Sequence, residues 1–136
     1  MMLLLNRILA LALLVIVVVL TLTALPSLGG HPLGAEVLLA HMAASGAMVF
    51  VLPAYAVVGL IGMAQHPSSN RLRSFGFWGL VVTGLLTIAT VFVCMLPFPS
   101  TDQMHQLIFW HSLAGYSMAV VAVVWVTGWF TKTRTV

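Results

Sequence analysis

Four long apolar runs, separated by short polar segments, make up almost the whole chain. The runs cover about 8–25, 37–63, 75–96 and 106–130. Each is long enough for a helix to cross the hydrocarbon of a bilayer, which takes roughly 20 apolar residues. The segments between them, at 26–32, 65–70 and 97–102, are rich in proline, glycine, serine and other turn formers that end helices. The pattern predicts an all-α, integral membrane four-helix bundle, with residues 1–136 as one transmembrane domain.

The first apolar run differs from a signal peptide in its length and in the residues after it. It comes after Arg7, but it spans about 18 residues, against the usual 7–15 of a signal sequence, and it is not succeeded by an A-x-A cleavage site. We therefore expect a retained span. Pro53 lies inside the second run and should kink that helix, because it frees a backbone carbonyl.

The composition supports a membrane protein and excludes several classes of function. Of 136 residues, 62% are hydrophobic and 5% charged, whereas a soluble domain carries roughly 25% charged residues. No residues remain for a soluble catalytic domain. A net charge of +3 arises from five basic and two acidic residues, too few to bind nucleic acid. The motifs of nucleotide-binding proteins and zinc proteases are absent. Cys94 is the one cysteine, so neither an internal disulfide nor covalent haem attachment through C-x-x-C-H can form.

The charged residues divide by sign between the two sides of the predicted bundle. The basic residues precede the first run, lie between the second and third runs, or come after the fourth: Arg7, Arg71, Arg73, Lys132 and Arg134. The acidic residues, Glu36 and Asp102, lie at the opposite ends of the runs. Because Lys and Arg are retained in cytoplasmic loops, we expect both termini in the cytoplasm of a multi-pass protein of the bacterial inner membrane.

Two histidines lie inside the predicted spans, where an imidazole is costly unless it has a partner. His41 lies about four residues into the second run and His111 about five into the fourth. Both runs cross from outside to inside, so the two imidazoles are expected at a similar depth, roughly 6–10 Å below the outer boundary. Met48 and Met118 each come seven residues after a histidine, or two helical turns, and so share its face.

Small residues surround both histidines, and the two halves of the chain share this pattern. The small residues are Ala44, Ser45 and Gly46 in the second run, and Ala114 and Gly115 in the fourth. Gly46 and Gly115 could provide the notches that a flat macrocycle between helices needs. A shift of 70 residues superposes His41 on His111 and Met48 on Met118, which suggests a duplicated two-helix hairpin. A pseudo-twofold axis along the membrane normal would then bring the two histidines together.

With His41 and His111 on different helices of a four-span chain, the sequence resembles the four-helix membrane b-type cytochromes. This class includes bacterial cytochrome b561-like proteins and the haem-bearing anchor subunits of respiratory dehydrogenases. The resemblance implies one haem b near the outer face, with His41 and His111 as its metal ligands. It also implies electron transfer between the quinone pool and an extracytoplasmic redox partner. The chain carries no histidine pair near the inner face for the second haem of the two-haem members.

These features predict an electron-transfer subunit of an oxidoreductase complex rather than an enzyme acting alone. The expected partners are other membrane subunits, a periplasmic cytochrome or dehydrogenase subunit, the lipid bilayer, and quinone as a further ligand. His105 lies about 240° around the helix from His111, so the two cannot ligate one iron from the same face. It could instead meet haem propionates or take protons from a quinol, as could the polar residues near the same boundary: His31, Glu36, Ser100, Thr101 and Asp102. Their plainer interpretation is a solvated surface.

Two other functions fit the same sequence. In the first, the chain is a haem-free accessory or assembly subunit, and His41 and His111 hydrogen-bond a neighbouring helix. In the second, it is a small metal or solute carrier with histidine and methionine as soft ligands. The inner half of the bundle lacks an ionisable group to continue a transport path, which disfavours the carrier. We expect His66 to be a loop residue, and the threonines at 83, 87 and 90 to bond their own helix.

Overall fold

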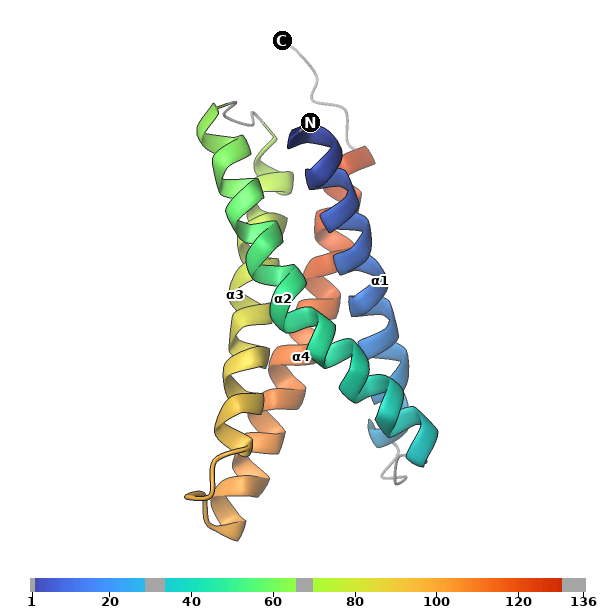
Figure 1. Cartoon of the computed structure of the whole chain (residues 1–136), viewed down its shortest axis with the longest axis vertical. Coiled ribbons are helices and arrows are strands. Elements are labelled where there is room, and N and C mark those ends of the chain that lie inside the picture. Colours follow the sequence, from blue (N-terminus) through green and yellow to red (C-terminus); the bar gives the residue numbers. More distant parts are fainter. Residues whose placement is uncertain (1, 29–33, 66–69, 131–136) are drawn as a thin grey trace. The chain divides into compact units, whose positions relative to one another are not determined.

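The computed structural model describes residues 2–28, 34–65 and 70–130, and within these ranges the chain forms four helices (Figure 1). The helices are α1 (Met2–Leu28), α2 (Ala35–Gln65), α3 (Arg71–Cys94) and α4 (Thr101–Phe130). Each is long and apolar enough to span a membrane. The prediction of an all-α fold is therefore confirmed in these ranges, and each predicted span corresponds to a helix that is able to cross a membrane by length and composition.

The chain divides after residue 67 into two compact units, each of which is a helical hairpin. In the first hairpin α1 packs against α2, and in the second α3 packs against α4. We call the end of each hairpin where its two helices are joined the connection end. Assembly of the two hairpins into one four-helix domain stays a prediction.

The core of the first hairpin is a narrow stripe of apolar side chains. Its buried residues recur every three or four positions: Ala10, Leu13, Val17 and Leu20 on α1, with Met48, Leu52 and Tyr55 on α2. This spacing places them on one face of each helix. Most of the remaining large apolar side chains are exposed, including Leu3 and Phe50 at 77% and 78%. Such an outer surface suits a lipid bilayer rather than water.

The second hairpin brings its helices together through glycines. A Cβ atom added to Gly76 would lie 2.6 Å from the Cα of Trp125, and one added to Gly79 would lie 2.7 Å from Cγ1 of Val121. A Cβ on Gly128 would lie 3.0 Å from the backbone nitrogen of Arg73. Small residues at these positions let the two helices approach closely, as is common between membrane helices.

The two hairpins bury corresponding positions. When 67 is added to the residue numbers of the four buried residues of α1, the result is four buried residues of α3, namely Phe77, Leu80, Gly84 and Thr87. A shift of 70 carries the three buried residues of α2 onto Met118, Ala122 and Trp125 of α4. The shift of 70 expected from the sequence thus holds for the second helix of each hairpin, while the first helix requires 67. Between corresponding buried positions, from Leu20 to Met48 and from Thr87 to Met118, the second hairpin is therefore longer by three residues.

The helices extend beyond the predicted spans at most of their ends, although α3 ends at Cys94, two residues before the predicted end at Leu96. Local hydrogen bonds explain two of the boundaries. Asn70 caps α3, because its side chain accepts hydrogen bonds from the backbone nitrogens of Leu72 and Arg73. At α4, the backbone nitrogen of Ser100 donates to Oε1 of Gln103 at 2.8 Å, and Oγ of Ser100 accepts from the backbone nitrogen of Gln103 at 3.4 Å. This capping box starts the helix at Thr101, inside the loop expected at 97–102.

The predicted start of the first loop, at Pro26, is wrong by three residues. Helix α1 continues through Pro26 to Leu28. A proline this close to a helix end disrupts few further backbone bonds. Oγ of Ser27 also donates to the carbonyl of Ala24 at 2.6 Å. Pro53 lies inside α2, which continues on both sides of it.

Candidate functional site

His41 in the first hairpin is hydrogen-bonded to the neighbouring helix. Its Nδ1 lies 2.8 Å from Oγ1 of Thr23 on α1. The Thr23 hydroxyl has one proton, which it donates to the carbonyl of Val19 at 2.7 Å. With that proton engaged, Oγ1 of Thr23 is left as an acceptor for Nδ1–H of His41. The contacts therefore favour the neutral tautomer that is protonated at Nδ1.

His111 in the second hairpin has the same arrangement with an additional acceptor. Its Nδ1 lies 3.0 Å from Oγ1 of Thr90 and 3.2 Å from the carbonyl of Thr87, both on α3. Oγ1 of Thr90 donates its own proton to that carbonyl at 2.8 Å. Both neighbours of Nδ1 are thus acceptors, and this imidazole too is favoured as the Nδ1–H tautomer.

The tautomer determines which ring nitrogen carries the lone pair that a metal would need. In a neutral imidazole protonated at Nδ1, the lone pair is on Nε2. Histidines that bind a metal through one nitrogen almost always donate the other N–H to a carbonyl, a carboxylate or water, which fixes the ring orientation. The contact between Nδ1 of His111 and the Thr87 carbonyl is of this kind. Both imidazoles are half-buried.

The two histidine–threonine pairs occupy corresponding positions in the two hairpins. Thr90 is 67 residues after Thr23, and His111 is 70 residues after His41, the same shifts that relate the buried residues. Each hairpin therefore holds its histidine against the preceding helix in the same way. The same contacts also join the helices, which is what the accessory-subunit alternative expects of these histidines.

The methionines predicted to share the histidine faces lie in the hairpin cores. Met48 and Met118 are both 2% exposed, and each is among the largest fully buried side chains of the described residues. At seven residues from the histidine, each lies about two turns farther from the connection end. Their burial within a hairpin makes core packing a sufficient explanation of both side chains.

The two predicted notch glycines differ in position relative to their histidines. No atom lies within 4 Å of a Cβ added to either Gly46 or Gly115, so neither glycine is required for packing within its hairpin. Gly115 is four residues after His111 and shares its side of α4. Gly46 is five residues after His41, or about 140° around α2. Only Gly115 is placed to leave space beside its histidine.

The other polar residues predicted near the outer boundary are exposed. Asp102 and His105 lie in the first turns of α4, and Glu36 lies in the first turn of α2. Ser100 and Thr101 are also exposed at the start of α4, and Ser100 forms its cap. His31 and His66 lie outside the described residues, as do Lys132 and Arg134. Exposure to solvent is enough to explain why the described members of this group are polar, so they do not require a ligand.

The threonine partners of the histidines are not evident from the sequence. The prediction that Thr83, Thr87 and Thr90 bond their own helix is confirmed, since each hydroxyl donates to a carbonyl three or four residues earlier. Thr90 also contacts His111, and Thr23 contacts His41, which the sequence pattern did not predict. A useful signal would have been a hydroxyl residue near the end of the preceding helix, at the depth of each histidine.

No family model matches this chain, and neither does any curated protein or solved structure. Within the described residues, no group of three or more His, Cys, Asp or Glu side chains could hold a metal ion. The repeated histidine–threonine pairs are therefore the arrangement on which a functional proposal can be built.

Proposed function

We propose that this chain is a membrane cytochrome b subunit that binds one haem b through Nε2 of His41 and Nε2 of His111. It transfers electrons between the quinone pool and an extracytoplasmic redox partner. The observation that carries the proposal is the repeated hydrogen bond of Nδ1 to a threonine of the preceding helix. This bond favours the tautomer in which Nε2 has the lone pair needed for an axial ligand.

The donor set fits a haem better than a bare metal ion. A porphyrin supplies four equatorial nitrogens, so the protein has to contribute only two axial ligands. A bare zinc ion in a structural or catalytic site usually takes three or four protein ligands, and the described residues contain no such cluster. When bound, the haem supplies one-electron redox chemistry at its iron. The chain would orient the two imidazoles through Thr23 and Thr90.

The proposed orientation rests on the charged residues. With Arg7, Arg71 and Arg73 on the cytoplasmic side, the connection ends of both hairpins face the periplasm of a bacterial inner membrane. Both histidines then lie toward the periplasmic side of their helices. We propose that a periplasmic cytochrome or dehydrogenase docks at this side within a larger membrane complex.

Single histidine substitutions test this function. His41→Ala and His111→Ala should each reduce the haem content of the purified chain to below about a tenth of the wild-type ratio, because one axial ligand is lost. His105→Ala is the matched control, since it removes an exposed histidine of α4 and should leave the haem content unchanged. Full haem content in His41→Ala or His111→Ala would contradict the assignment of that ligand.

The second candidate is a haem-free accessory subunit, which the cross-helix histidine–threonine contacts also favour. In that function the imidazoles serve only to hold each hairpin together, a contribution of about 0.6 kcal/mol on average and at most about 1.7 kcal/mol in membrane proteins. The two candidates differ in visible absorbance. A folded wild-type chain with no haem in its assembled complex would favour the accessory subunit.

A further inference from the structure

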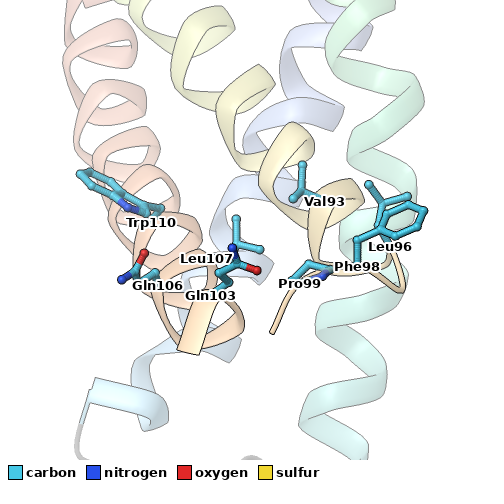
Figure 2. Close-up of a pocket in the computed structure, with 8 residues that line it drawn as sticks. All are labelled: Val93, Leu96, Phe98, Pro99, Gln103, Gln106, Leu107 and Trp110. Carbon is cyan, nitrogen blue, oxygen red and sulfur yellow. The ribbon is translucent and has the colours of Figure 1, made fainter. Parts of the chain in front are cut away.

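A cavity of about 560 Å³ lies at the connection end of the second hairpin (Figure 2). Its volume is within the range of about 300–1,000 Å³ that is typical of small-molecule sites. Leu96, Phe98 and Pro99 line it from the connection, and Gln103, Gln106 and Trp110 line it from α4. All of its walls belong to the second hairpin, so the cavity is defined within one compact unit.

The lining is neutral and carries two amide side chains. None of the described residues that line the cavity is ionisable. A glutamine amide offers two N–H donors and a carbonyl acceptor. Oε1 of Gln103 accepts a hydrogen bond from the backbone nitrogen of Ser100, and this bond anchors the glutamine side chain. The bond does not use the amide N–H donors of Gln103. The site therefore suits an uncharged ligand that has oxygen acceptors, whereas a lipid phosphate would find no cation in the lining.

The cavity lies close to His111 along α4. Leu107, another lining residue, precedes His111 by four residues and so lies on the same side of the helix, with a rise of about 6 Å between them. Trp110 directly precedes His111 and supplies an aromatic wall. A ligand in the cavity would therefore lie within about one helical turn of the histidine.

We propose that this cavity binds the head group of a membrane quinone or quinol. A planar uncharged ring with oxygens on opposite edges matches an aromatic and apolar lining that has two amides. The tail of such a ligand is apolar, and Leu96 and Phe98 provide an exposed apolar border toward lipid. A part in electron transfer rests on the proposed function, whereas binding of the ring does not require haem.

Tryptophan fluorescence measures this binding directly. The full chain is placed in phosphatidylcholine nanodiscs and titrated with a short-tail benzoquinone, with quinone-containing empty nanodiscs as the partition control. We expect saturable quenching that is largely lost in Trp110→Phe and retained in Trp129→Phe, whose ring lies at the far end of the same hairpin. Gln103→Leu combined with Gln106→Leu should weaken binding about tenfold, because two hydrogen-bonding amides are removed. Gln65→Leu is the matched control and should bind as wild type.

A second readout applies if the double glutamine variant does not fold. An azido-benzoquinone is photolysed with the wild-type chain, and the labelled peptides are identified by mass spectrometry. Labelling concentrated between residues 93 and 110, and suppressed by excess unlabelled quinone, supports the site. Non-saturable quenching that is equal for all tryptophans would overturn the proposal, as would labelling spread over all four helices. Retention of one phospholipid in place of quinone, lost in the double glutamine variant, would also overturn it.

The same titration in His41→Ala/His111→Ala distinguishes this proposal from the proposed function. The cavity contains neither histidine, so quinone should still bind when haem is absent. A haem-containing chain without saturable quinone binding would overturn the cavity assignment alone. A haem-free wild-type chain that binds quinone would overturn the cytochrome assignment alone.

Discussion

The threonine hydroxyl beside each histidine favours the tautomer in which Nδ1 carries the proton. Thr23 and Thr90 donate to carbonyls of their own helices and therefore accept from Nδ1 of the histidine opposite. The sequence alone indicated both histidines as candidates, because an imidazole in an apolar span is costly unless it has a partner. It could not identify the threonines, since a threonine that bonds its own backbone is ordinary in a membrane helix. The contact of each threonine with its histidine becomes visible only when the two helices of the hairpin are paired.

Replacing these threonines should weaken haem binding without removing a ligand. Thr23→Val and Thr90→Val keep the shape of the side chain but remove the Nδ1 acceptor. Loss of such an orienting contact typically costs about 10–100-fold in affinity, which haem titration of the apoprotein measures. Thr23→Ser should bind nearly as the wild type. Thr83→Val is the matched control, because the Thr83 hydroxyl bonds the Gly79 carbonyl of its own helix. Equal affinity in all four variants would contradict an orienting role.

Close helix packing at glycines distinguishes positions that look alike in the sequence. Gly76 faces the backbone of Trp125, whereas Gly46 faces open space. Nothing in the sequence separates these two glycines, since both lie within apolar helices. The spans themselves were predictable from hydropathy, and their ends were not, because side-chain caps at Asn70 and Ser100 set two of them.

Gly76→Ala and Gly46→Ala should have opposite consequences for stability. The added methyl group at Gly76 would lie 2.6 Å from the Cα of Trp125, so α3 and α4 must separate. Overpacking of this kind typically costs about 1–3 kcal/mol. At Gly46 the methyl group meets nothing, and alanine should be neutral or stabilising by up to about 1 kcal/mol. Unfolding by a denaturing detergent measures both changes. An unchanged midpoint in Gly76→Ala would show that the helices are less close than described.

Asn70 joins the start of α3 to the end of α4, and two substitutions separate its contributions. Its Nδ2 donates to the Gly128 carbonyl at 2.9 Å, while its Oδ1 caps α3. Asn70→Ala should destabilise the second hairpin by about 1–2 kcal/mol, because both contacts are lost. Asn70→Asp keeps the cap and loses the donor, so we expect a smaller loss in the same detergent unfolding assay. Equal losses in the two variants would assign the whole effect to the bond with Gly128.

At the scale of the whole molecule, the charged residues of the sequence indicate how the chain is oriented across the membrane. The structure of each hairpin by itself does not give this orientation. Arg7, Arg71 and Arg73 lie away from the connection ends, and by the positive-inside rule they support the proposal that those ends face the periplasm. The local pattern thus predicted the helices, while their direction across the membrane stays a prediction. It could not give the assembly of the two hairpins, because apolar helix faces in lipid lack the hydrophobic driving force that dictates packing in water.

Single cysteines test this orientation. In a Cys94→Ala background, Thr101→Cys and Gln65→Cys place exposed thiols at opposite ends of the helices without changing the net charge. A membrane-impermeant maleimide applied to intact spheroplasts should label Thr101→Cys and spare Gln65→Cys. Permeabilised cells should show labelling of both. Labelling of Gln65→Cys alone in intact spheroplasts would reverse the proposed orientation.

The measurement that tests the central claim most directly is the dithionite-reduced minus oxidised absorbance spectrum of the purified wild-type chain or its complex, combined with a haem assay normalised to protein. The two histidine–threonine pairs predict a b-type difference spectrum and about one haem for each chain. A flat difference spectrum with no haem, in a folded and fully assembled preparation, would contradict the account and make the histidines structural.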